Sequence, residues 1–231
     1  MPNLKNDDNM KLKIFILTFS SSRPIIGTGK QMQAFFSEKF PDYDLFNQHD
    51  GDKYKFRYPL IQCKTINGPM VVGINEGVET LKQTYDQFKD IILGKNTYNI
   101  LQRNIHIDEY EFGISDKMHL YRFVTPLMAL DNKNYKKFDS LRNYKEIEIS
   151  LTKRINTYIV DHMSRNLGYN VPEWLQTDFK LKEITKSKFE GSYMITFYGD
   201  FRTNFNIPDY IGIGKARSIG FGTVIQLGIH H

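Results

Sequence analysis

The order of short apolar strands and amphipathic helices in the first hundred residues constrains the fold more than any other feature. The nearly continuous apolar run at 12–19 ends at the polar cluster Ser20-Ser21-Ser22 and predicts a buried strand. Apolar residues at helical spacing over 32–40 then predict a helix that Pro41 ends. A first strand is thus followed by a first helix.

A hairpin and a second helix are predicted next. Asn67-Gly68 indicates a tight turn between a strand at 54–58 and a strand at 70–74, because both turn residues tolerate a positive φ. Apolar spacing predicts a helix over 75–94. With a further strand near 98–102, this half has the βαββαβ order of a ferredoxin-like domain.

The second half repeats this order of strands and helices with one helix missing. The predicted elements are a strand at 119–130, a helix at 147–168, a hairpin of 179–189 with 193–201, and a last strand at 221–229. No helical period is visible over 205–213. The sequence therefore predicts an α+β protein of tandem ferredoxin-like (RRM-like) domains, at residues 10–103 and 104–231, of which the second is partly degenerate.

Composition limits the function classes. A hydrophobic fraction of 40% over 231 residues can bury a core, and no apolar stretch approaches the roughly 18 residues that span a membrane. The single cysteine, Cys63, excludes an internal disulfide and a cysteine zinc cluster, and its apolar flanks predict a reduced thiol in a cytoplasmic protein. The net charge of +5 suits a polyanionic partner but is also common in other soluble proteins.

A glycine-rich run just before the last strand is the most informative motif. The candidate ligand-binding residues of this run are Gly212, Gly214, Lys215, Arg217, Ser218, Gly220 and Gly222. Glycines allow close approach of the backbone and can expose N–H groups as an anion nest, and the two cations suit phosphates. A strand follows this run, so it is not a P-loop, which precedes a helix. The alternative interpretation is a glycine-rich turn that packs against a helix.

His49 is the histidine that we single out, because it lies in the polar stretch Asn47-Gln-His-Asp-Gly51. An imidazole that titrates near neutrality can act as a general acid or base. The alternative is a surface histidine beside Asp50 with no chemical role. The other internal histidines show no metal-ligand spacing, so no metal site is predicted.

These features together resemble the CRISPR-associated endoribonucleases that cut repeat RNA in precursor crRNA, members of the RAMP superfamily. The resemblance rests on the glycine-rich run at 212–222, on the tandem ferredoxin-like order over nearly the whole chain, and on His49 after the first helix. Non-catalytic CRISPR subunits share the glycine-rich run, whereas His49 favours a nuclease. Asn47 and Gln48 stand where some relatives carry a second histidine.

The resemblance implies metal-independent cleavage without a cofactor, in which the 2′-OH of the RNA attacks the adjacent phosphate and leaves a 2′,3′-cyclic phosphate and a 5′-OH end. His49 would be the general acid or base, and Lys53 and Tyr54 would stabilise the phosphorane or orient His49. Lys215, Arg217 and the loop N–H groups would bind the RNA backbone. The alternative function is that of a non-catalytic RNA-binding subunit. A homodimer and a CRISPR effector complex are the assemblies that the resemblance admits.

Overall fold

The computed structural model describes residues 10–47, 49–50, 53–54, 57–130, 138, 143–172 and 174–228. In chain order the elements are β1 (Met10–Ser21), α1 (Gly29–Lys39), β2 (His49–Asp50), β3 (Lys53–Tyr54), β4 (Ile61–Thr65), β5 (Pro69–Ile74), α2 (Glu76–Thr84), β6 (Asp90–Leu93), β7 (Asn96–Phe123), α4 (Tyr144–Thr157), β8 (Thr177–Phe189), β9 (Ser192–Asn206) and β10 (Val224–Gln226). Three further helical segments are η1 (Tyr158–Ser164), which continues α4 with π-helical geometry, and the tighter 3₁₀ turns η2 (Arg165–Leu167) and η3 (Arg217–Ile219).

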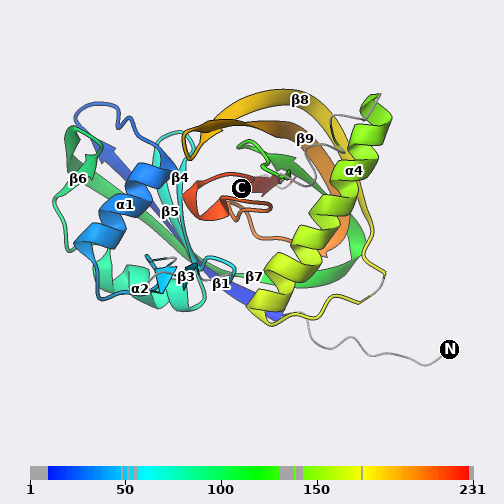
Figure 1. Cartoon of the computed structure of the whole chain (residues 1–231). Helices are drawn as coiled ribbons and strands as arrows, with labels where there is room; N and C mark the ends of the chain where they lie inside the picture. Colours follow the sequence, from blue (N-terminus) through cyan, green and yellow to red (C-terminus); the bar gives the residue numbers. More distant parts are fainter. Residues whose placement is uncertain are drawn as a thin grey trace.

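The first half has the predicted ferredoxin-like topology. Its antiparallel strands lie in the order β4-β5-β1-β7, in which the first strand of the unit occupies an inner position beside the third and the fourth. The helices α1 and α2 lie together in the half drawn at the left of Figure 1. The β4–β5 hairpin turns at Asn67 and Gly68, with φ of 52° and 121°. This conformation explains why the sequence uses that pair.

The second half repeats the order as β8-β9-β7-β10, again antiparallel. The helix of the first crossover is α4 with η1 and η2. As predicted, the described residues 207–223 between β9 and β10 contain no second α-helix, only the short 3₁₀ turn η3. The segment in its place is the glycine-rich loop, by which we mean residues 212–222. Figure 1 shows this segment, in red, between the two halves of the molecule.

β7 belongs to both halves and joins their sheets. It pairs with β1 up to Phe112 and with β9 from Gly113 onward, so a single 28-residue strand serves as the last strand of one unit and the first of the next. Gly113 has a φ of +133°, and a Cβ there would lie 2.6 Å from the ring of Tyr169. The strand therefore changes partners at a position where a side chain would collide with the second half.

The continuous apolar sequence of β1 is explained by burial on both faces. Phe15, Leu17 and Phe19 pack in a cluster with residues of α1 and α2. Leu12 and Ile14 belong to a second cluster that is shared with the C-terminal half. The core of the protein therefore extends from one half into the other through β1.

Several predicted boundaries are corrected by the structure. The first strand of the hairpin is β4 rather than 54–58; within that range Tyr58 is buried outside any strand, and residues 55–56 lie outside the described residues. α2 ends at Thr84, because residues 90–93 pair with β7 as a strand. The strands predicted at 98–102 and 119–130 are parts of the single strand β7, which ends at Phe123.

The last strand is shorter than predicted, because β10 covers only three residues of the range 221–229. The domain junction predicted at 103/104 lies inside β7. Within the described part of the chain, the structure contains no helix with the length and apolar character needed to cross a membrane.

Candidate functional site

The three residues predicted to carry catalysis lie in one small hairpin. β2 and β3 pair antiparallel with His49 opposite Tyr54 and Asp50 opposite Lys53. The stretch around His49, predicted as a loop, is thus extended and paired at His49 and Asp50. Directly opposite residues of an antiparallel pair lie on the same face. The backbone register therefore makes Tyr54, rather than Lys53, the residue opposite His49.

Two buried aromatic residues flank this hairpin in the chain. Phe46, 2% exposed, packs against Phe36 and Phe40 of the first half, and the Ser37 hydroxyl donates to its carbonyl oxygen over 2.8 Å. Tyr58, also 2% exposed, belongs to the core that extends into the second half. The hairpin is therefore anchored on both sides, with one anchor in each cluster of the core.

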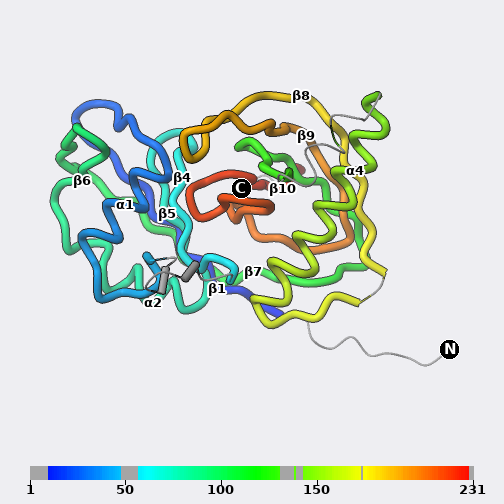
Figure 2. The backbone as a smooth tube through the Cα atoms, viewed as in Figure 1, coloured from blue at the N-terminus to red at the C-terminus, as the bar shows by residue number. Residues whose placement is uncertain are grey.

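The glycine-rich loop docks on the N-terminal half. Its turn η3 contacts α1 and β4, and its central residues lie against the backbone of β4. Figure 2 shows this segment beside β4. A Cβ at Gly29, the first residue of α1, would overlap the carbonyl oxygen of Ile219, and a Cβ at Gly220 would lie 3.1 Å from the carbonyl oxygen of Cys63. The glycines on both sides thus permit a close approach of backbones.

Most N–H groups of the loop are engaged within the protein, contrary to the predicted anion nest. The N–H of Gly212 donates to Gln62 Oε1 over 2.9 Å, and that of Gly222 donates to the carbonyl oxygen of Pro126. Further backbone bonds are donated by Ile213, Lys215, Ile219, Gly220 and Phe221. All four glycines of the loop are buried. These glycines allow close packing of the backbone, which agrees with the alternative interpretation of the run as a packed glycine-rich turn.

The polar side chains of the loop are not equally accessible. Arg217 lies over the ring of Tyr58, with Cζ 4.8 Å from the ring centroid, and its Nη1 donates to the carbonyl oxygen of Gly214 over 2.7 Å. Ser218 is 7% exposed. Lys215 is half-buried. RNA binding by these residues stays a prediction. Lys215 and Arg217 are the cationic residues of the loop that could bind phosphate groups.

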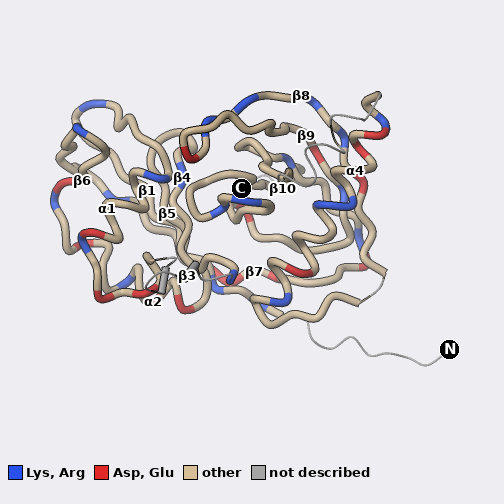
Figure 3. Tube along the Cα trace, viewed as in Figure 1, with Lys and Arg blue, Asp and Glu red and all other residues tan. Residues whose placement is uncertain are grey.

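His162 joins the loop cations in space, which sequence reasoning missed. It lies on η1, exposed, with its ring 5.3 Å from that of Tyr158. Partial burial lowers its pKa most, followed by the charge of Arg217 and then those of Arg165 and Lys215, while the Asp161 carboxylate raises it. The imidazole therefore lies within the field of both loop cations. Arg165, one turn further along, pairs with Asp161 over 2.9 Å. The basic cluster of His162, Lys215 and Arg217 could not be predicted, because its members are distant in the sequence and no local motif connects them. Figure 3 shows the distribution of basic residues over the molecule, including the central segment.

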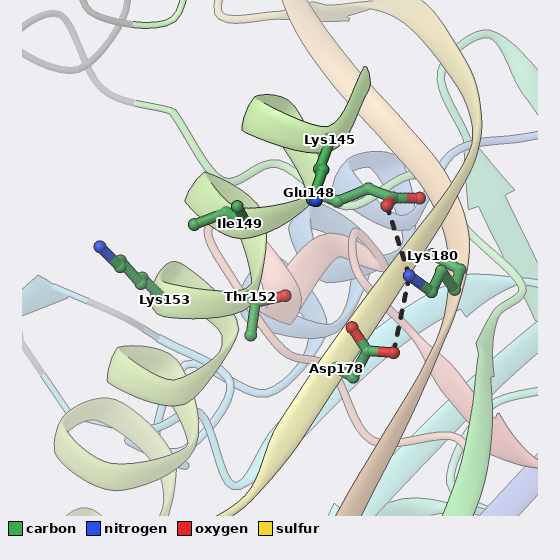
Figure 4. Close-up of a pocket in the computed structure, with 7 residues that line it drawn as sticks. All are labelled: Lys145, Glu148, Ile149, Thr152, Lys153, Asp178 and Lys180. Atoms are coloured by element: carbon green, nitrogen blue, oxygen red, sulfur yellow. Dashed lines mark hydrogen bonds and ion pairs between the residues drawn. The ribbon is translucent and has the colours of Figure 1, made fainter. Parts of the chain in front are cut away.

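A separate groove of about 260 Å³ lies between α4 and β8. Figure 4 shows Glu148 and Asp178 on both sides of Lys180, which they bind at 3.5 and 3.7 Å. Glu148 also accepts from the N–H of Leu181 over 3.0 Å, so it fastens the edge of β8 to the helix. Lys153 points away from Lys180. Glu148, Asp178 and Lys180 in the groove are thus paired with one another.

No cluster of three or more histidine, cysteine, aspartate or glutamate side chains suited to a metal ion occurs in the described ranges.

Two family models match consecutive parts of the chain. A model described as the Cas6b N-terminal domain matches residues 10–111, and a model described as the Cas6b C-terminal domain matches residues 113–227. The boundary between the two matches falls where β7 changes partners from β1 to β9.

Solved structures agree with these matches. A crystal structure of Cas6b is 31% identical, with 94% of this chain and all of that chain covered and a TM-score of 0.85. A crystal structure of the CRISPR RNA processing endoribonuclease Cas6b is 29% identical, with 94% of this chain and 100% of that chain covered and a TM-score of 0.75.

A sequence relative is also similar to this chain. An uncharacterized protein of Methanocaldococcus jannaschii is 34% identical over 139 residues, which are 60% of this chain and 93% of that protein.

Proposed function

Because this chain belongs to the Cas6b family, we propose that it is an RNA-cleaving enzyme that processes CRISPR RNA. Its substrate is the repeat in precursor crRNA. One of the solved family structures is described as a CRISPR RNA processing endoribonuclease, and it resembles this chain over its full length. The observation that carries the proposal is the β2–β3 hairpin, where a candidate acid or base and a candidate hydrogen-bond donor are paired.

The proposed reaction is a transesterification within the RNA and needs no metal ion. The 2′-oxygen bonds to the adjacent phosphorus, the bond from phosphorus to the 5′-oxygen breaks, and the products are a 2′,3′-cyclic phosphate and a 5′-OH end. A base accepts the proton of the 2′-OH, and an acid gives a proton to the departing 5′-oxygen. Each such proton transfer contributes about 10²–10⁴-fold to the rate.

His49 is the group that we assign to one of these proton transfers. Its pairing with Tyr54 supports Tyr54, rather than Lys53, as the residue that acts beside it. A phenol hydroxyl can donate a hydrogen bond to a phosphorane oxygen or to the imidazole. Lys53 is opposite Asp50 in the register, so we assign its charge a supporting role rather than the role beside His49.

The RNA backbone binds to the basic side chains of the glycine-rich loop and of η1. Lys215 and Arg217 contribute charge from the loop, and His162 adds an exposed imidazole beside them. Neutralised phosphates release counterions, so this binding weakens with salt. The buried glycines contribute by holding the loop in shape rather than by touching the phosphates.

The experiment incubates the full chain with its repeat RNA in EDTA and identifies the ends of the products. We expect a 5′-OH and a cyclic phosphate, and we expect no cleavage when the nucleotide before the scissile phosphate is 2′-deoxy. Stable binding of uncut repeat RNA would instead indicate the non-catalytic RNA-binding subunit. Cleavage of the 2′-deoxy substrate would overturn the proposed chemistry.

A further inference from the structure

An unusual lysine lies in β4, the edge strand of the N-terminal sheet. Lys64 of β4 is 0% exposed, as are its neighbour Gln62 and its partner Thr223. Burial of an ammonium group in a protein interior costs several kcal/mol unless the charge is paired. The ionisable group beside Lys64 is the Cys63 thiol, whose pKa burial raises to about 12, so this thiol is uncharged near neutrality.

The hydrogen bonds of Lys64 fit a neutral amine. Its Nζ donates to Gln62 Oε1 over 2.8 Å and to Thr223 Oγ1 over 3.1 Å. A neutral amine has two hydrogens for two acceptors, whereas an ammonium has a third hydrogen to satisfy. Burial lowers the pKa of Lys64 to about 7, in agreement with this count. The described residues supply no third acceptor to Nζ.

The same atoms also bind the two ends of the glycine-rich loop. Gln62 Oε1, which accepts from Lys64, accepts the N–H of Gly212 as well, over 2.9 Å. Thr223, which accepts from Lys64, donates its hydroxyl to the carbonyl oxygen of Gly220 over 3.1 Å. Gly212 and Thr223 in turn form an isolated β-bridge with each other. We call the bridged pair Gly212 and Thr223 the loop neck. One amine therefore connects β4 to both sides of this neck.

Two further contacts relate this network to the basic side chains of the loop. The Tyr58 hydroxyl donates to the carbonyl oxygen of Gly212 over 2.8 Å, and its ring lies under Arg217. The amide nitrogen of Gln62 donates to the carbonyl oxygen of Pro59, one residue after Tyr58. A displacement of Gln62 would therefore disturb both the loop neck and the segment that carries Tyr58.

We propose that Lys64 and Gln62 form a buried polar pin that fixes the glycine-rich loop to the N-terminal half and so positions Lys215 and Arg217 for RNA. Both are positioning residues, because both side chains are fully buried from solvent. The consequence for RNA binding rests on the proposed function, whereas the pin itself is a property of the free protein. An apolar side chain in place of Lys64 would fill the space but leave Gln62 and Thr223 without their shared donor.

The first experiment measures hydrogen–deuterium exchange of the full chain without RNA. We expect Lys64→Met to raise exchange in peptides that cover residues 212–222 by about tenfold, which is the effect of one lost hydrogen bond of about 1.4 kcal/mol on a local opening. Peptides from β9 should be unchanged. Thr223→Val, which removes one acceptor and keeps the lysine, should act in the same direction if Lys64→Met does not fold.

The control is Lys13→Met on β1, which is separated from β4 by β5 in the same sheet. Lys13 is half-buried, and its Nζ binds Glu79 over 3.1 Å at the surface. This variant loses a lysine of the same sheet but should leave exchange of the loop as in the wild type. Unchanged loop exchange in both Lys64→Met and Thr223→Val would overturn the pin.

The second experiment separates positioning from catalysis. Lys64→Met should raise the Kd for repeat RNA about as much as Lys215→Ala does, while the single-turnover cleavage rate at saturating RNA stays within about twofold of wild type. A normal Kd for Lys64→Met beside a weakened Lys215→Ala would contradict the positioning role. If the wild-type chain neither binds nor cuts repeat RNA, the proposed function fails, and the exchange experiment still decides on the pin.

Discussion

The guanidinium of Arg217 lies over the ring of Tyr58, and the hydroxyl of the same tyrosine donates to the carbonyl oxygen of Gly212. One residue of the N-terminal half thus supports the glycine-rich loop through both its ring and its hydroxyl. Burial raises the pKa of this hydroxyl to about 12, so it remains a neutral donor under ordinary conditions.

Tyr58→Phe should lower the free energy of unfolding by roughly 1–3 kcal/mol, because the buried Gly212 carbonyl loses its donor while the ring under Arg217 remains. Urea denaturation measures the change. Tyr193→Phe is the control, since Tyr193 is 72% exposed. Equal unfolding midpoints for wild type and Tyr58→Phe would contradict the structural role of this hydrogen bond.

Gly222→Ala should destabilise the protein more than Gly191→Ala. Both glycines have a positive φ, of 61° and 82°, so each substitution carries a conformational cost of about 1–2 kcal/mol. A Cβ at Gly222 would also overlap the carbonyl oxygen of Ile213, whereas nothing lies within 4 Å of a Cβ at Gly191. Thermal or urea unfolding of the two variants isolates the cost of close packing, and equal losses would argue against it.

The stability contributed by Lys64 should depend on pH. Its pKa is about 7 in the folded protein and that of an ordinary lysine in the unfolded chain, so the unfolded state binds more protons above pH 7. The free energy of unfolding of wild type, relative to Lys64→Met, should therefore rise by about 1–2 kcal/mol from pH 7 to pH 8.5. It should be flat well below pH 7, where both states are protonated.

Lys13→Met again provides the reference for this titration. Its hydrogen bond to Glu79 raises the pKa of Lys13 in the folded protein, so this lysine stays charged throughout the interval. Urea unfolding at both pH values should give a constant difference between wild type and Lys13→Met. A constant difference for Lys64→Met as well would mean that Lys64 is charged in the folded protein.

Much of the fold was predictable from the sequence because its signals are local. The Asn67-Gly68 turn and the missing helix after β9 were both confirmed. The end of α2 was missed because Ile92 continues the helical spacing although it lies in β6, 52% exposed. The continuity of β7 was missed because pairing partners, rather than composition, hold this strand together.

The candidate site was predictable only in part. His49 and Tyr54 are close in the sequence, so a local pattern could connect them. Lys64 and Thr223 are distant in the sequence, and a lysine in a strand is usually a solvated residue, so its burial followed only from the docking of the loop. The proximity of His162 to the loop cations likewise follows from the docking of the loop, because these residues are distant in the sequence.

Tyr54→Phe should slow single-turnover cleavage of repeat RNA by about 10²-fold, the effect of removing one donor to developing charge. Lys53→Ala is the matched test at the neighbouring position, which is opposite Asp50 rather than His49, and should slow cleavage much less. Rates at saturating RNA measure both effects. A larger loss for Lys53→Ala than for Tyr54→Phe would contradict the assignment based on the strand register.

The most direct test of the proposed function is the single-turnover rate at which wild type and His49→Ala cleave cognate repeat RNA in EDTA. We expect wild type to cleave without metal and His49→Ala to be slower by about 10²–10⁴-fold, with an unchanged Kd for the RNA. An equal rate for the two proteins in EDTA would contradict the role of His49.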